Sequence, residues 1–192
     1  MTDLITGDAF GELFRSFQLT ARRLEGRRRY VEASEQEALA RFLGGQAKDP
    51  AYTAARAGWL NDTVRRAAEA GKRFERVRIV DEPLTDYQRF GLRNSRDNVA
   101  AGEDVRYLDR ARAIELDLPD HDFWLFDDER LALLWFTPDG RLLGAQVTRE
   151  AALVRQHKHW LDVAQKEATL YAEFLAADPS RELPPRLGGG RT

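Results

Sequence analysis

The sequence predicts an α/β protein of the α+β type, in which N-terminal helices pack on a mixed sheet with a C-terminal β-meander and a long closing helix. Three observations support this class. Apolar residues recur at helical spacing in the first third, gather in short β-branched and aromatic runs from residue 72 onward, and return to helical spacing after residue 148. We expect a helical region over 1–71, an α/β unit over 72–176 and a disordered tail over 177–192, with one compact domain overall.

The first third of the chain predicts three helices. Apolar residues at helical spacing follow Asp8, a candidate N-cap. A capping box formed by Ser34 and Glu37 predicts the start of a second helix, which a glycine pair ends. A third helix is predicted over residues 54–70. The arginine-rich run over 22–29 fits either a strand or an extended linker.

The rest of the chain predicts strands, one short helix and one long helix. The β-branched and aromatic runs are bounded by Gly, Pro and Asp residues, as is typical of strands, and turn residues separate the last three into an antiparallel meander. A short helix is expected near residues 84–92. Thr148 can cap the closing helix, which continues to about residue 174. The predicted strands cover residues 74–80, 105–108, 123–126, 131–136 and 142–147.

The composition excludes several kinds of site. The 192 residues include no cysteine, so disulfides, thiolate metal sites and a cysteine nucleophile are excluded. Thirty basic and thirty-two acidic residues leave a net charge of −2, so nucleic acid could be contacted only locally, through the arginine run that begins at Arg22 and ends at Arg29. No apolar stretch is long enough to span a bilayer and no signal-peptide pattern is present, so we expect a cytoplasmic protein without membrane contact.

No metal or cofactor is expected. His157 and His159 are two positions apart on a predicted helix, where side chains point in nearly opposite directions and cannot chelate one ion. The glycine-rich stretches lack the preceding strand and following helix of a phosphate-binding loop.

The stretch HDFWLFDD, residues 121–128, contains the sharpest functional candidates. His121 and Asp128 are seven residues apart and flank large apolar residues. Three interpretations are open. The pair performs phosphoryl-type chemistry, or it belongs to a phosphate or ligand pocket without catalysis, or it brackets a core strand whose Phe123 and Leu125 face the interior.

A second group of candidates consists of polar and aromatic residues near the predicted strands. If the loops are short, Asp86, Tyr87 and His121 converge at one edge of the sheet, where open α/β sheets bind ligands. Alternatively, Arg78 and Arg106 form surface ion pairs with acidic neighbours, worth about 0–1 kcal/mol each. The candidate ligand- or partner-binding residues are Arg78, Asp86, Tyr87, Glu103, Arg106, Asp122 and Trp124.

Nearly the whole chain resembles an uncharacterised family common in actinobacteria. The resemblance rests on the segments FRSF (14–17), RLE (23–25), RVRIV (76–80), EPLTDY (82–87), AGEDVRYL (101–108) and HDFWLFD (121–127). The family has no established activity. Its members are often encoded near helix-turn-helix regulators of developmental or stress type, which implies such a regulator as a partner.

The part of the chain from Arg73 to Ala168 resembles the repeat unit of the phospholipase D superfamily, which implies a phospholipase D-like half. His121 and Asp128 have the spacing of that family's His-x-Lys-x4-Asp motif, in which the histidine attacks phosphorus and the lysine stabilises charge. Phe123 stands at the lysine position, and losing such a donor costs about 2.7–4 kcal/mol by analogy with oxyanion holes. A single motif also implies that an active site would need a homodimer.

We therefore expect a non-enzymatic regulatory or signalling protein that binds a small ligand or a protein partner such as a helix-turn-helix regulator. The alternative is a dimeric phosphodiesterase or phosphoryl-transfer enzyme, with His121 as nucleophile, Asp128 orienting it, and Arg78 or Arg106 replacing the lysine. A second alternative is nucleic-acid binding through the arginine run, with an affinity that falls steeply with salt.

Overall fold

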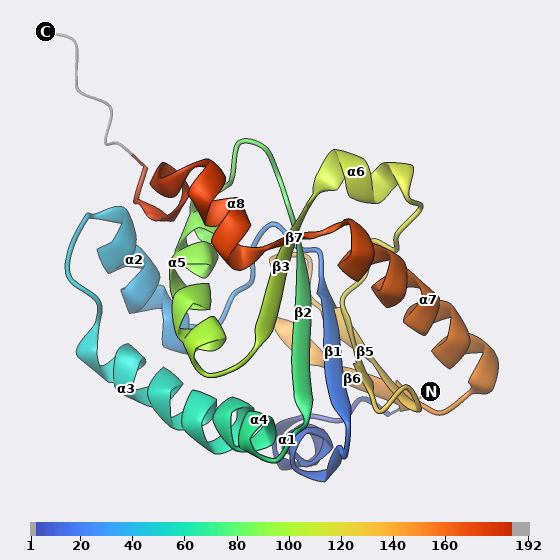
Figure 1. Ribbon diagram of the computed structural model, residues 1–192. Coiled ribbons are helices and arrows are strands. Elements are labelled where there is room, and N and C mark those ends of the chain that lie inside the picture. Colours follow the sequence, from blue (N-terminus) through green and yellow to red (C-terminus); the bar gives the residue numbers. More distant parts are fainter. Residues whose placement is uncertain (1–2, 186–192) are drawn as a thin grey trace, which may run out of the picture.

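The computed structural model describes residues 3–185 and has a seven-stranded mixed sheet at its centre (Figure 1). The strand order is β6-β5-β4-β1-β2-β3-β7. Strands β1, β2 and β3 are parallel, β4 runs antiparallel to β1, and β4 to β6 form the predicted meander. The strands are β1 (Thr20–Glu25), β2 (Arg73–Val80), β3 (Asp104–Asp109), β4 (Phe123–Phe126), β5 (Arg130–Phe136), β6 (Leu142–Thr148) and β7 (Thr169–Leu170).

Helices cover both faces of the sheet, as Figure 1 shows with α6 and α7 on one side and α2, α3 and α5 on the other. A mixed sheet between helices confirms the predicted fold class, while the phospholipase D-like architecture stays a prediction. The α-helices are α1 (Gly7–Ser16), α2 (Gln36–Leu43), α3 (Pro50–Trp59), α4 (Arg66–Glu69), α5 (Asp86–Ala100), α6 (Arg110–Glu115), α7 (Ala151–Glu167) and α8 (Tyr171–Ala177).

The face of the sheet under α6 and α7 is apolar, and we call it the apolar face. Leu24, Val77, Phe123 and Leu125 alternate with residues of the opposite face along their strands and pack against Leu161 of α7. All five are nearly inaccessible to solvent. Burial of this continuous cluster accounts for much of the stability of the sheet, because each fully buried aliphatic or aromatic side chain contributes about 1.5–3 kcal/mol.

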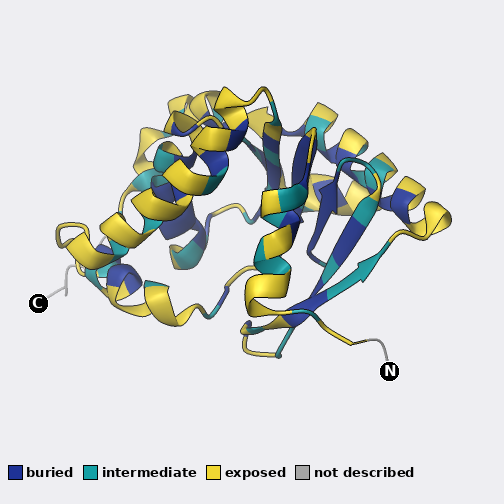
Figure 2. Cartoon of the chain, turned by 90° about the horizontal axis from the view of Figure 1, so that it is seen from below, coloured by how far each residue is buried: buried dark blue, intermediate teal, exposed yellow. Residues whose placement is uncertain are grey.

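The opposite face is covered at its two ends and open between them. At one end, α1 and the helical stretch over residues 60–69 pack on Ala21, Phe74 and Phe126. At the other end, α5 and α8 pack on Val105 and Tyr107. Helix α2 packs on α5 rather than on the sheet. Figure 2 shows the buried residues along the strands and the inner sides of the helices, with exposed residues on the outer turns.

Three predicted helix boundaries are wrong. The first helix begins at Gly7, after Thr6, so Asp8 lies in its first turn and is not the N-cap. Ser34 lies in the 3-10 turn Ala33–Glu35 and makes no capping bond. The third helix starts at Pro50, where Asp49 accepts a hydrogen bond from the Tyr52 N–H at 2.6 Å.

The long closing helix is also interrupted. α7 ends at Glu167, and the two residues of β7 pair with β3 before α8 begins. The sheet crosses the predicted boundary at residue 71, since β1 comes from the N-terminal region and lies between β4 and β2. Part of the predicted tail is ordered, because Pro179–Glu182 form a 3-10 turn in which Arg181 pairs with Glu82 at 2.9 Å. Residues 186–192 lie outside the described residues. Between residues 3 and 185, no helix is long and apolar enough to cross a membrane.

Candidate functional site

The uncovered middle of the sheet carries charged side chains from β1 and β2, and we call it the arginine face. Arg23 lies beside Arg76 in the register of β1 and β2, and Glu25 lies beside Arg78. Residues that are opposite each other on paired strands point to the same face. Two neighbouring strands therefore place three arginines and one glutamate on a surface that most sheets fill with apolar side chains.

These charges are neutralised by a buried network. Arg76 donates to Glu25 at 2.6 Å and to Glu103 at 2.7 Å, and its guanidinium lies over the ring of Trp124. Glu25 is shared, because Arg23 and Arg78 also lie 3.5 Å from its oxygens. The pairing is required, since a buried charge that loses its partner costs about 3–5 kcal/mol.

Asp122 holds the end of β1 to the network. Its carboxylate accepts the Gly26 N–H at 2.9 Å, the Tyr30 hydroxyl, and Arg23 Nη2 at 3.3 Å. Asp122 is almost completely buried and directly precedes β4, so its side chain and that of Trp124 share the arginine face. The aspartate thereby fixes the loop that brings Tyr30 over the sheet.

A cleft of about 260 Å³ lies above the arginine face. Its floor is formed by β1 and β2, one wall by aromatic and aliphatic side chains of α1, α3 and the meander, and the other wall by α5 and the segment before α2. This volume is at the small end of ligand-binding pockets, which suits a compact molecule rather than a dinucleotide. The lining residues that matter most here are Arg23, Arg56, Arg76, Arg78, Glu32 and Glu35.

Several guanidinium groups in this cleft have a donor without an acceptor. The Nε atoms of Arg23, Arg56 and Arg78 are buried and make no hydrogen bond to any described residue. Arg78 also lies so close to α5 that a Cβ on Gly91 would be 2.6 Å from its Nη1. The helix therefore has a glycine where the arginine passes. An unmatched buried donor costs about 1–3 kcal/mol, so the cluster holds more donors than the protein itself satisfies.

The acidic side of the cleft is built on the 3-10 turn Ala33–Glu35. Glu35 accepts hydrogen bonds from two tyrosines, Tyr87 at 2.6 Å and Tyr52 at 3.1 Å, one on each carboxylate oxygen. These bonds come from α5 and α3 and fix the glutamate in the lining of the cleft. Glu32, three residues earlier, is exposed and lines the same cleft.

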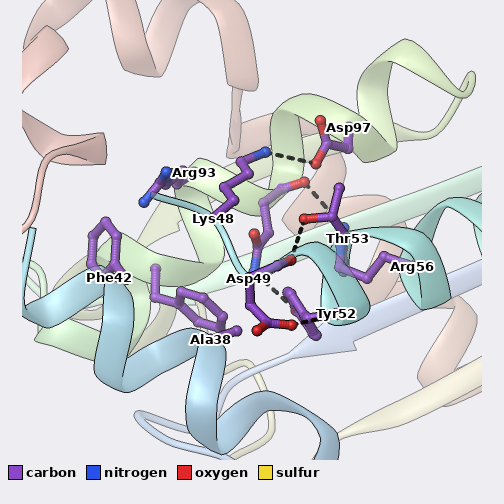
Figure 3. A pocket seen from close by; sticks show the side chains of 11 residues that line it. Ala38, Phe42, Lys48, Asp49, Tyr52, Thr53, Arg56, Arg93 and Asp97 are labelled. Atoms are coloured by element: carbon purple, nitrogen blue, oxygen red, sulfur yellow. Dashed lines mark hydrogen bonds and ion pairs between the residues drawn. The ribbon is translucent and has the colours of Figure 1, made fainter. Parts of the chain in front are cut away.

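A second, smaller pocket lies between α2, α3 and α5 (Figure 3). Lys48 reaches across it to Asp97 at 3.1 Å, and Thr53 donates to the Asp49 carbonyl. Its volume is about 20 Å³, which is enough for one water molecule but not for an organic ligand. Arg56 lines both this pocket and the larger cleft, so the two adjoin each other.

The structure brings together five of the predicted ligand- or partner-binding residues and separates two. Arg78 and Tyr87 line the cleft, while Glu103, Asp122 and Trp124 hold its floor. Arg106 is beside Val77 in the register, so it points to the apolar face side, where it pairs with Asp104 at 2.9 Å. Asp86 is exposed in the first turn of α5.

His121 and Asp128 do not come together. They lie beyond opposite ends of β4, and His121 instead contacts His157 of α7, with 3.0 Å between their Nε2 atoms. Asp128 pairs with Lys158 at 3.2 Å. Phosphoryl-type chemistry that requires both groups at one phosphorus therefore has no geometric support. Among residues 3–185, no three His, Cys, Asp or Glu side chains are grouped as metal ligands.

The arginine run does not form one basic surface. Arg22 is buried on the apolar face side, where it pairs with Glu75 at 3.0 Å and Asp162 at 2.8 Å, whereas Arg23 points to the cleft. Arg28 pairs with Asp81 at 3.0 Å. A strand directs successive side chains to opposite faces, so a run of arginines in β1 is divided between the two sides of the sheet.

Sequence reasoning did not assign Arg23, Glu25, Glu32, Glu35 or Arg56 to a ligand site. Arg23 and Glu25 lie in the run that we could not assign to a strand, because polar residues on both faces remove the alternating pattern. Arg56 lies on a helix that showed no functional signal. A useful signal was the pair RxE in β1 and RxR in β2, whose period of two places all four charges on one face.

Comparison with known proteins places the chain in a family but adds no chemistry. A search of curated proteins found no significant match. The sequence profile of one family matches residues 8–176, a span that contains the sheet, the arginine face and every residue of the cleft discussed above. The chain therefore belongs to the family described as "Domain of unknown function (DUF6879)".

Proposed function

We propose that this protein is a non-enzymatic regulatory protein that binds a small polar ligand in the cleft above the arginine face. The supporting observation is a 260 Å³ cleft lined by four arginines, of which Arg56 and Arg78 keep a buried Nε–H with neither a hydrogen-bond nor an ion-pair partner among the described residues. A ligand oxygen that draws these guanidinium groups toward the cleft would offset the cost of the unmatched donors. A helix-turn-helix partner stays a prediction from the family resemblance.

The ionisable groups of the cleft favour recognition over turnover. Acid–base catalysis requires a group whose pKa is near the working pH. Burial raises the pKa of Glu25, but Arg78, Arg23 and Arg76 overcome this effect and hold that pKa well below its ordinary value. Burial and the nearby Glu35 carboxylate raise the pKa of Tyr87 far above its ordinary value. Each of these groups therefore keeps one protonation state at neutral pH.

The proposal can be tested without knowing the ligand. Dialysed protein is incubated with the small-molecule filtrate of a cell extract, separated from free solutes, denatured, and its released molecules are identified by mass spectrometry. We expect the wild type to retain a compound that Arg56→Met and Arg78→Met lose by at least tenfold, because charge-assisted hydrogen bonds to guanidinium groups contribute about 1.5–3 kcal/mol each.

Arg155→Met is the matched control, since Arg155 is exposed on α7, across the sheet from the cleft. This variant should retain the compound like the wild type. Circular dichroism checks that each variant is folded. Retention of nothing by the wild type, or equal retention by all four proteins, would contradict the proposal.

A further inference from the structure

Two groups of charged side chains line the cleft, and we call them its two poles. Arg56 and Arg78, the positive pole, carry charge that the protein only partly neutralises. Glu32 and Glu35, the negative pole, have no Arg or Lys at ion-pair distance among the described residues, and Tyr52 contacts both poles, since it donates to Glu35 and lies beneath the guanidinium of Arg56. The two poles line the same cleft.

The positive pole is identified by its acceptors. Arg56 Nη2 donates to the Asn94 carbonyl at 3.1 Å and to the Asn98 side chain, both of which are uncharged. Arg78 has one carboxylate at ion-pair distance, Glu25 at 3.5 Å, and that carboxylate lies much closer to Arg76, at 2.6 Å. A carboxylate or phosphate entering the cleft would therefore find two guanidinium groups whose charge has no dedicated partner.

The negative pole is identified by its neighbours. Both oxygens of Glu35 accept tyrosine hydroxyls, which position the carboxylate without neutralising it. Partial burial and the adjacent Glu35 raise the pKa of Glu32, and Arg23 opposes this shift without cancelling it, as expected for two carboxylates that share a site. An ammonium group placed between them would relieve this repulsion.

One wall of the cleft is apolar. Phe10, Leu134, Phe136 and Leu142 line the cleft on the side of α1 and the meander, and Trp59 adds an indole from the end of α3. The formal charges of the whole lining and floor nearly cancel, since four arginines face five carboxylates: Glu25, Glu32, Glu35, Glu103 and Asp122. A simple anion would be repelled by the acidic side, and a simple cation by the arginines.

We propose that the ligand is a small zwitterion of amino-acid type, with its acidic group at Arg56 and Arg78, its amine at Glu32 and Glu35, and an apolar body against the aromatic wall. This inference rests on the proposed function and specifies the ligand class for the same cleft. The volume of about 260 Å³ fits one such molecule.

Three probes that differ by one charged group test the class. Isothermal titration compares L-phenylalanine, which has both charges, with 3-phenylpropionate, which lacks the amine, and 2-phenylethylamine, which lacks the acid. We expect L-phenylalanine to bind at least tenfold more tightly than either. Equal or tighter binding of 3-phenylpropionate or of 2-phenylethylamine would overturn the two-pole assignment.

Charge-neutral variants locate the amine. Glu35→Gln should reduce the affinity for L-phenylalanine about tenfold and leave that for 3-phenylpropionate unchanged or higher. Glu37→Gln is the control, because Glu37 is exposed on α2 and does not line the cleft. An equal loss of both affinities in Glu35→Gln would indicate a structural role for Glu35 and would contradict its assignment to the amine.

The extract experiment separates the two proposals. If the wild type retains a compound but binds none of the three probes, the zwitterion class is wrong and the cleft remains a binding site. If the retained compound lacks either an amine or an acidic group, the two-pole assignment is wrong. If nothing is retained and no probe binds, both proposals fail.

Discussion

Gly91 shows how a single missing side chain positions the arginine face. It is buried in the middle of α5, although glycine costs about 1 kcal/mol relative to alanine in a helix interior. A Cβ there would be 2.6 Å from Nη1 of Arg78, a contact too short to exist without movement. The glycine is therefore explained by the passage of the guanidinium group and not by the helix.

Gly91→Ala should accordingly destabilise the protein, despite the gain in helix propensity. We expect a loss of about 1–3 kcal/mol in the free energy of unfolding, typical of overpacking, together with weaker ligand retention as Arg78 is displaced. Urea unfolding followed by circular dichroism measures the first effect. Gly58→Ala is the control, since Gly58 is exposed in α3 with open space around it and should gain up to about 1 kcal/mol. A stability gain in both variants would contradict this explanation.

At the same scale, the sequence indicates some residues of the site and conceals others. Arg78 and Tyr87 could be predicted because polar residues stand out beside a β-branched run. Arg106 stands out equally, and nothing in its neighbourhood shows that it points to the other side of the sheet. Arg78 and Arg106 point to opposite faces because Arg106 pairs with Val77, one residue before Arg78, in the register of β2 and β3. This register depends on contacts between residues far apart in the chain.

Among the elements, α7 is joined to β4 by a pair of histidines. His157 Nδ1 lies 2.8 Å from the Leu153 carbonyl and must donate to it, so its Nε2 accepts the hydrogen bond from His121 Nε2–H. Both rings contact Trp160 of α7, and Phe123 also packs against them. This arrangement needs a neutral His157, because a protonated His157 has no acceptor at Nε2.

The pair should make stability depend on pH. Burial lowers the pKa of His121, an effect that Asp120 and Asp122 only partly oppose, and burial together with His121 lowers the pKa of His157. A histidine with a lowered pKa binds protons more tightly in the unfolded chain. The contribution of such a histidine to the free energy of unfolding is therefore complete above the pKa of the unfolded chain, about 6.5. This contribution is lost as the pH falls toward and through the lower pKa of the folded protein.

Thermal unfolding between pH 7.5 and 5.5 measures this effect, because few carboxylates titrate in that window. We expect a fall in melting temperature that is reduced in His157→Gln. His159→Gln is the matched control, since His159 is exposed on the same helix, and it should keep the wild-type pH dependence. An unchanged pH dependence in His157→Gln would show that other groups cause it.

Elements are predictable where an apolar run is bounded by turn residues or where apolar residues recur at helical spacing. β4 to β6 have the first pattern and most of α7 has the second, and the predicted positions agree closely with the structure. β1 has neither pattern, since one of its faces carries Arg23 and Glu25 and the other carries Arg22. The break between α7 and α8 has no glycine or proline to mark it, and depends on β7 pairing with β3.

At the scale of the whole molecule, the order of elements could be predicted but their arrangement in the sheet could not. β1 lies between β2, about 50 residues later, and β4, about 100 residues later. Short loops favour neighbours in sequence, so pairing over such distances is not visible in local patterns. The open middle of the arginine face is a consequence of this arrangement, and the cleft was therefore missed as a cavity although several of its residues were named.

The same arrangement predicts an uneven distribution of stability. β1 and β2 are central in the sheet, and two core clusters pack against them. α2 is attached through a small cluster with α5, formed by Ala38, Leu39, Phe42 and Phe90. The ion pair between Lys48 and Asp97 beside it has side chains that are 39% and 40% exposed, and it contributes about 0–1 kcal/mol. Regions with few buried apolar contacts open without global unfolding.

Native-state hydrogen exchange should therefore give opening free energies for the hydrogen-bonded amides of α2 and α3 that are at least about 2 kcal/mol lower than those of β1 and β2. Equal opening free energies would mean that α2 and α3, the helical layer, open only when the sheet unfolds. The turn before α2 carries Glu35 and α3 carries Arg56, so a ligand held between the two poles would connect this layer to the arginine face. Saturating ligand should then slow exchange in α2 and α3 more than in the central strands, because binding stabilises only the closed state. A ligand that instead slowed exchange uniformly would be bound without bridging the helical layer and the sheet.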